Sequence, residues 1–345
     1  PMRTLCLTLW CICSMAPVWA QHHDQEHLSV PQSEALLWQY LEDYSPRSYF
    51  LMQDYLALPQ RFEFGNSIMT VSKSEDLMFW VNEPTPRGIR EDIGTVVHET
   101  NHGYTDSKAY QLIERELGED YEFGVSYSAF YIHQEHIILV EHLEVLNSHQ
   151  IAKDIPQALR TFRFTPYISP AAPLLGSQKD GIYGLMDEWC SYMNGTRTEV
   201  DLFEYYEAHP QGRGQHYVQW IQDVAGTHFA HLEFKFFILK YLLKVKSEKP
   251  ALFRQYLHQP ELLEAFFAID EAFVLVVEEY YEKKTLIKAT LIEEGLRVVD
   301  DGEFFMVEGS GIGTYENDYR LLEAELQKSI YQQLLRELES AHRLP

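Results

Sequence analysis

The sequence contains little cysteine: there are 4 residues, and Cys6, Cys11 and Cys13 all stand within the first twenty positions. If that stretch is removed on maturation, Cys190 is the one cysteine left, and an intrachain disulfide is impossible. Small exported proteins often depend on disulfides because their cores are too small to hold them folded. A chain of 345 residues with 46% apolar residues has enough material for a full core. The sequence therefore predicts a protein stabilised by burial.

Apolar runs long enough to cross a membrane are also missing. The run from Leu5 to Val18 is shorter than the roughly 20 residues that a spanning helix needs. It follows a positive start at Met2-Arg3 and ends in Val18-Trp19-Ala20, with small residues where a signal peptidase cleaves. We expect residues 1–20 to be a signal peptide and the mature protein to be secreted or periplasmic, without membrane insertion. A retained N-terminal anchor is the alternative.

Positive charge is scarce. Lys and Arg number 28 against 52 Asp and Glu, so the formal charge is −24. A nucleic acid or an anionic membrane surface would repel such a chain, and we expect neither as a partner. The sequence also lacks internal repeats and any linker rich in Gly, Pro or Ser. We therefore expect one domain over residues 21–345, with the site in a cleft between an upper lobe at about 60–120 and a helical lower lobe at about 180–345.

Helical periodicity dominates what is present, with short β-rich runs near the start of the domain, so the fold class is α+β and mostly helical. Residues 121–168 are ambiguous, because part of this stretch is β-branched while 137–146 is also compatible with a helix. From about 215 to the end the pattern is nearly all helical. The expected strands are 61–64, 67–71 and 77–81, and the expected helices are 33–44, 46–58, 89–117, 181–194 with Gly195 at its end, 215–246, two that start at Pro250 and Pro260, and 315–342.

The helix expected at 89–117 carries the pattern H-E-x-x-H in His98, Glu99 and His102. Residues four apart lie on one face of a helix, so the two imidazoles can bind one metal ion. Two nitrogens leave a divalent ion short of ligands, so a third protein ligand and a water must complete the set. Zinc lowers the pKa of such a water to about 7, and the carboxylate of Glu99 can then remove its proton.

This stretch, Thr95 to Tyr104, resembles the active-site motif of the zincin metallopeptidases. The downstream sequence Glu188-Trp189-Cys190-Ser191-Tyr192 resembles the motif that opens with the third ligand in the gluzincin branch, although the aromatic residue comes one position early. The resemblance implies that Zn²⁺ is held by His98, His102 and Glu188, and that the fold is zincin-like and two-lobed. Ser191 is small and lies on the face of Glu188, so it would let two helices pack closely around the ion.

Several assignments stay open at this point. Other carboxylates could replace Glu188 as ligand, and the partner that orients His98 is either Asp106 or Asp187. The donor to an oxyanion is unassigned. A second metal is a further possibility, and Cys190 is expected to be a buried free thiol. The rival ligands are Asp187, Glu141 and Glu144, the oxyanion candidates are His228, His231 and Tyr183, and the second-metal candidates are His133, His136 and His142.

The residues alone indicate metal-activated water, and the zincin resemblance implies cleavage of peptide bonds in a peptide or protein substrate. In this interpretation Glu99 acts as general base and then returns the proton to the leaving amine. One alternative is a zinc hydrolase of another amide or ester, such as a cell-wall crosslink. Another is a secreted binding protein that keeps the fold without turnover, in which case Glu99 would have no catalytic role.

Overall fold

The structure is a computed structural model that describes residues 24–209 and 213–343, so the predicted signal peptide at 1–20 lies outside the described residues. The fold is mostly helical with small antiparallel sheets, which confirms the α+β class. No helix within the described ranges is long and apolar enough to cross a membrane. The α-helices are α1 (Val30–Tyr44), α2 (Pro46–Ala57), α3 (Pro86–Glu116), α4 (Phe164–Tyr167), α5 (Gly176–Lys179), α6 (Gly181–Asp201), α7 (Phe203–Ala208), α8 (Arg213–Ala225), α9 (Ala230–Glu248), α10 (Pro250–Leu257), α11 (Pro260–Glu293), α12 (Glu316–Leu326) and α13 (Ser329–His342).

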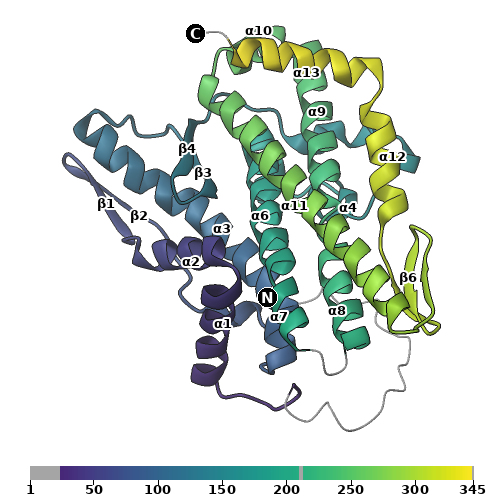
Figure 1. The fold of residues 1–345 in the computed structure, drawn as a ribbon. Coiled ribbons are helices and arrows are strands. Elements are labelled where there is room, and N and C mark those ends of the chain that lie inside the picture. The colour runs from purple at the N-terminus through teal and green to yellow at the C-terminus, as the bar shows by residue number, and fades with distance from the viewer. Residues whose placement is uncertain (1–23, 210–212, 344–345) are drawn as a thin grey trace.

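The strands form three separate antiparallel sheets, each built from neighbouring strands in the chain. Two of them flank α3: the β1–β2 hairpin covers its C-terminal end, and β3 packs along it. The third lies between α11 and α12 (Figure 1). The strands are β1 (Arg61–Phe64), β2 (Ser67–Thr70), β3 (Tyr127–His133), β4 (His136–Glu141), β5 (Val298–Asp300), β6 (Phe304–Val307) and β7 (Ser310–Gly313).

Helix α3 has a well-defined start. Thr85 is its N-cap, with a side-chain oxygen that accepts a hydrogen bond from the backbone N–H of Gly88 at 3.0 Å, and Pro86 occupies the first helical position. The helix then runs for 31 residues and carries His98 and His102 in its middle. The metal-binding pattern therefore lies on a regular helical backbone, as the sequence predicts.

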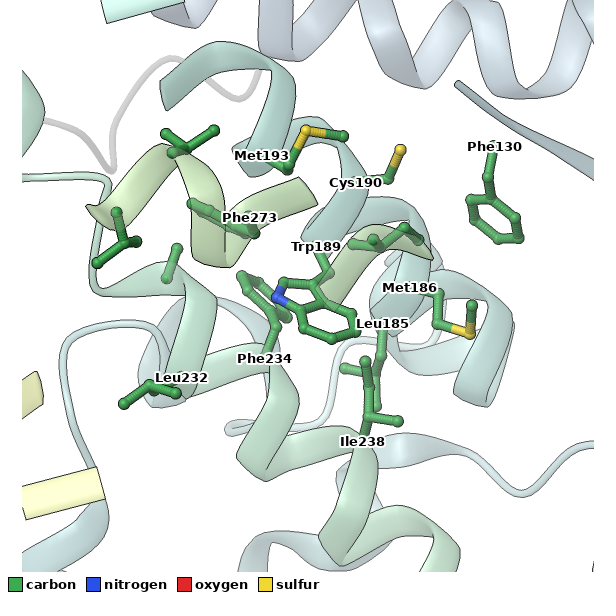
Figure 2. Close-up of a cluster of buried hydrophobic side chains, with 14 of the residues drawn as sticks. Phe130, Leu185, Met186, Trp189, Cys190, Met193, Leu232, Phe234, Ile238 and Phe273 are labelled. Atoms are coloured by element: carbon green, nitrogen blue, oxygen red, sulfur yellow. The ribbon is translucent and has the colours of Figure 1, made fainter. Parts of the chain in front are cut away.

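Helix α6 is the central element of the molecule. It lies between α3 on one side and α9 and α11 on the other (Figure 1). Its apolar face packs Trp189 and Met193 among side chains of α9 and α11, such as Phe234 and Phe273 (Figure 2). The opposite face, which includes Glu188 and Ser191, is directed toward α3. Burial of a large aromatic side chain such as Trp189, which is 0% exposed, supplies about 2–3 kcal/mol or more and holds this orientation.

Gly195 does not end α6, contrary to the prediction from sequence, because the helix continues to Asp201. A Cβ atom at Gly195 would lie 2.7 Å from the backbone oxygen of Gly94 in α3 and 3.3 Å from the Cβ of His98. The glycine is therefore required for the close approach of the two helices beside the metal-binding pattern. The neighbouring Asn194 begins the glycosylation sequence Asn194-Gly195-Thr196. It is 4% exposed and donates a hydrogen bond to the backbone oxygen of Tyr131, so its amide is not accessible in the folded protein.

Other element boundaries also differ from the prediction. Residues 77–80 form a 3-10 helix instead of a strand, with Leu77 buried. None of the described strands lies beside this segment to form the hydrogen bonds of a sheet. The ambiguous stretch after 121 contains the β3–β4 hairpin, and residues 142–147 are not helical. The helix expected at 215–246 is broken at 226–229, and the last helix is broken at 327–328. The β5–β7 sheet interrupts the stretch expected to be helical. Its short apolar runs have no clear period, so the sequence pattern did not indicate strands there.

Candidate metal centre

Three ligand atoms converge between α3 and α6. The Nε2 atoms of His98 and His102 are 3.1 Å apart, and Oε2 of Glu188 lies 3.6 Å from the first and 3.4 Å from the second. A tetrahedral ion with ligand bonds of about 2.0–2.2 Å separates its ligand atoms by about 3.3–3.6 Å. The two sides that end at Glu188 have this length and the side between the imidazoles is slightly shorter, so the triangle is close to the size that one such ion requires. Among the described residues, these three form the one group of histidine, cysteine or carboxylate side chains whose ligand atoms lie close enough to share an ion.

The carboxylate of Glu188 supports the same interpretation. Glu188 is 8% exposed, and its Oε2 is buried without a hydrogen-bond partner among the described residues. A buried carboxylate oxygen without a partner carries a large desolvation cost, and a cation placed at the centre of the triangle would offset it. The donor set of two imidazoles and one carboxylate also suits a divalent metal. The residues present therefore fit a bound ion.

The electrostatics of the two imidazoles differ. Burial, together with nearby His102 and Arg163, lowers the pKa of His98 well below its usual value, so this ring is neutral, the form that binds metals. Burial opposes protonation of His102 as well, but the carboxylates of Asp187 and Glu188 outweigh it and raise its pKa. The two carboxylates therefore make this centre attractive to positive charge, as a metal site requires.

Asp187 is not a ligand but a partner of His102. Its Oδ2 lies 2.6 Å from Nδ1 of His102, so the carboxylate can accept the N–H of the ring and direct Nε2 toward the centre. The sequence left this aspartate as a partner for His98 or a rival ligand, and the structure places it on His102 instead. Asp106 contacts neither imidazole through a hydrogen bond. Ser191 lies at the helix contact as expected: its hydroxyl is buried and accepts from the amide of Asn101 at 2.8 Å.

Within the described part of the chain, no carboxylate forms a hydrogen bond with Nδ1 of His98. The ring of Tyr192, one helical turn after Glu188 on α6, packs edge-on against it with centroids 4.4 Å apart. The hydroxyl of Tyr192 shares a hydrogen bond of 2.8 Å with that of Tyr167, and the guanidinium of Arg163 lies 4.1 Å from the centroid of the Tyr192 ring. Arg163 is itself fixed by a buried ion pair of 2.6 Å with Glu233. Packing therefore holds His98 in place where a carboxylate is absent.

Glu99 lies beside the ligands and remains partly exposed. Burial, followed by the charges of Glu188 and Asp187, raises its pKa, while His102 acts in the opposite direction. No hydrogen bond holds its carboxylate within the described part of the chain. A carboxylate in this condition is able to exchange a proton with a water at the centre.

The other candidates from the sequence lie elsewhere. Glu141 accepts a hydrogen bond from Tyr127 on the β3–β4 hairpin, and Glu144 pairs with Lys249, so neither is a ligand. His133 and His136 face each other at the hairpin end, and His142 lies apart from them, so they do not form one metal site. Cys190 is a buried free thiol, as expected, and burial raises its pKa.

The three oxyanion candidates are also committed to other contacts. His231 pairs with Asp270 at 2.8 Å, and Nε2 of His228 lies 3.3 Å from the hydroxyl of Tyr281, so both belong to a polar cluster with α11. The hydroxyl of Tyr183 donates to Gln259 and accepts from the backbone of residue 143. Tyr167, whose hydroxyl contacts that of Tyr192 beside the centre, is not among the site residues predicted from the sequence. It lies on the short helix α4, and no motif marks it.

Comparison with known proteins gives no match: no protein-family model, no curated protein and no solved structure matches this chain. The resemblance to zincins consists of the two short motifs around Glu99 and Glu188. Support for a function therefore comes from the arrangement of side chains at this centre.

Proposed function

We propose that this protein is an exported zinc-dependent peptidase with a zincin-like, two-lobed catalytic domain. The observation that carries the proposal is the convergence of His98, His102 and Glu188 at 3.1–3.6 Å, with Glu99 directly beside them. Two imidazoles, one carboxylate and an open fourth position are the ligand set of catalytic zinc in hydrolases. When bound, zinc supplies a Lewis acid that polarises a carbonyl and lowers the pKa of water to about 7.

The side chains of this protein would carry out proton transfer and hold the ligands in position. Glu99 accepts the proton of the attacking water and passes it to the leaving amine, and burial, by raising the pKa of Glu99, helps it to hold that proton. Asp187 keeps the Nε2 of His102 directed at the centre. The packing of Tyr192 restricts the ring of His98 in the same way.

The direct test of this function is a substrate panel. Zinc-loaded and chelator-treated protein would be incubated with peptides, peptidoglycan fragments and simple esters, and the products would be identified by mass spectrometry. We expect zinc-dependent cleavage of peptides. Cleavage confined to cell-wall amides or to esters would instead support the alternative hydrolase, and absence of any zinc-dependent cleavage would contradict an enzymatic function.

We propose Tyr167 as donor to the oxyanion, because its hydroxyl contacts that of Tyr192 at 2.8 Å and the ring of Tyr192 packs against His98. Burial and the nearby charge of Glu188 raise its pKa, so its hydroxyl keeps its proton. Replacing Tyr167 by Phe is expected to lower kcat about 100-fold with KM nearly unchanged, because the donor acts on charge that develops in the transition state. Steady-state kinetics on a peptide would measure this. Tyr192→Phe is the matched control, since it removes the hydroxyl that bonds Tyr167 but leaves that donor in place; an equal loss in both variants would contradict the assignment.

Asp187→Asn is expected to weaken zinc binding by about 10–100-fold without abolishing it. The amide can still contact Nδ1 of His102, but it no longer compensates the charge on the ring. Competition with a chromophoric chelator would give the affinity. Asp106→Asn serves as control, because Asp106 lies one turn from His102 without a hydrogen bond to it. Unchanged affinity in Asp187→Asn would show that this aspartate does not orient the ligand.

A further inference from the structure

A pocket of about 380 Å³ opens directly beside the metal centre. Its wall includes His102, Asp187 and Glu188, so the pocket and the centre share their residues. Glu188 is 8% exposed, and its Oε2 is buried without a hydrogen-bond partner among the described residues. A substrate whose scissile bond lies at the centre would therefore place a neighbouring group in this pocket.

One carboxylate of the lining has no direct ion pair, although the charges of His102 and Lys179 act on it from a distance. Asp180 is paired with Lys179 at 2.6 Å, and Asp187 and Glu188 contact His102 at 2.6 and 3.4 Å, at the centre where these residues would hold a zinc ion. Asp106 remains: it lines the pocket and forms neither a hydrogen bond nor an ion pair within the described ranges. It lies one helical turn after His102 on α3, so its side chain projects from the same face as the ligand.

The lining also includes an aromatic pair that suits a flat cation. The ring of His142 stacks on Tyr183 with centroids 4.1 Å apart and an interplanar angle of 6°. Burial lowers the pKa of His142 to about 4, so the ring is neutral at physiological pH and does not repel positive charge. Neutral aromatic faces stack well against a guanidinium group.

We infer that this pocket receives a cationic group of the substrate, an ammonium or a guanidinium, with Asp106 as its counter-charge. The inference rests on the proposed hydrolase function of the same centre and specifies its substrate class. The cation is either the side chain of a Lys or Arg residue or the free amino terminus of a peptide, since both present the same chemistry to a carboxylate.

Hydroxamates test the inference without requiring turnover, because the hydroxamate group binds the metal and the remainder of the ligand enters the pocket. Zinc-loaded full-length protein would be titrated calorimetrically with arginine hydroxamate, norleucine hydroxamate and the N-acetyl form of each. If the side chain occupies the pocket, both arginine ligands bind about tenfold more tightly than the norleucine ligands. If the amino terminus occupies the pocket, acetylation weakens the binding of both ligands, and the arginine and norleucine ligands bind with equal affinity.

Asp106→Asn is expected to remove this preference while the affinity for N-acetyl-norleucine hydroxamate stays unchanged. Asp43→Asn, an exposed change on α1 away from the pocket, should keep the preference. Equal binding of the four ligands, no binding at all, or a full preference in Asp106→Asn would overturn the inference. Peptide cleavage without such a preference would reject the pocket alone, and a preference without any cleavage would reject the peptidase function alone.

Discussion

Replacing Glu99 by glutamine is expected to lower kcat for peptide hydrolysis by about 10²–10⁴-fold while zinc remains bound. Glutamine has the shape of glutamate but cannot accept the proton of the attacking water. His98, His102 and Glu188 are unchanged in this variant, so the metal site itself stays complete. The loss should therefore appear in kcat far more than in KM, which steady-state kinetics on a cleaved peptide would resolve.

Two controls make the Glu99 experiment specific. Glu116→Gln changes an exposed glutamate near the end of the same helix and should leave kcat unaffected. Metal analysis of both variants should give the same zinc content as the wild type. A Glu99→Gln protein that holds zinc and cleaves every substrate at the wild-type rate would support the binding-protein alternative, in which this glutamate has no proton to transfer.

Loss of Glu188 should have the second large effect, on metal affinity and stability together. Glu188→Gln replaces the negative ligand with a neutral amide, and we expect zinc affinity to fall by more than about 100-fold, beyond the loss for an outer partner such as Asp187. Zinc at 1,000 times its dissociation constant stabilises the folded wild type by about 4 kcal/mol. At about 2 cal/mol/K of unfolding entropy per residue, this corresponds to a rise in Tm of about 6 °C.

Thermal unfolding with and without zinc would measure this effect. The wild type should show the zinc-dependent rise in Tm, and Glu188→Gln should lose most of it. The rival carboxylate Glu141 provides the matched control, because Glu141→Gln lies outside the centre and should keep the full rise. Equal zinc responses in the wild type and Glu188→Gln would exclude Glu188 as a ligand and would leave the centre with two imidazoles only.

Some of this architecture could be predicted because it depends on neighbours in the chain. The start of α2 at Pro46 and the β1–β2 hairpin around Gly65 follow from local backbone preferences, and the structure has both. The helical spacing of His98 and His102 is likewise local. Gly195 was misread for the same reason: a glycine after an apolar helix is typical of a C-cap, and its contact with Gly94 depends on a residue about a hundred positions away.

The pairing of side chains at the centre could not be predicted either, because it also depends on residues far apart in the chain. Asp187 could be placed near the candidate centre from its position beside Glu188, but whether it contacts His98, His102 or neither depends on how α6 is rotated against α3. That rotation is determined by the apolar face of α6, where Trp189 packs against α9 and α11. Tyr167 was missed because no pattern in the sequence connects it to Tyr192.

The fold class, the helix that carries His98, Glu99 and His102, and the small residue Ser191 at the contact between two helices could all be predicted. They depend on periodicity and spacing, which act over a few residues. The folded chain was needed to select Glu188 among the rival carboxylates, to place Asp187 on His102 and to bring Asp106 to the adjoining pocket. Those contacts join segments that lie far apart in the chain, and close packing of the core between α3, α6 and α9 sets their distances.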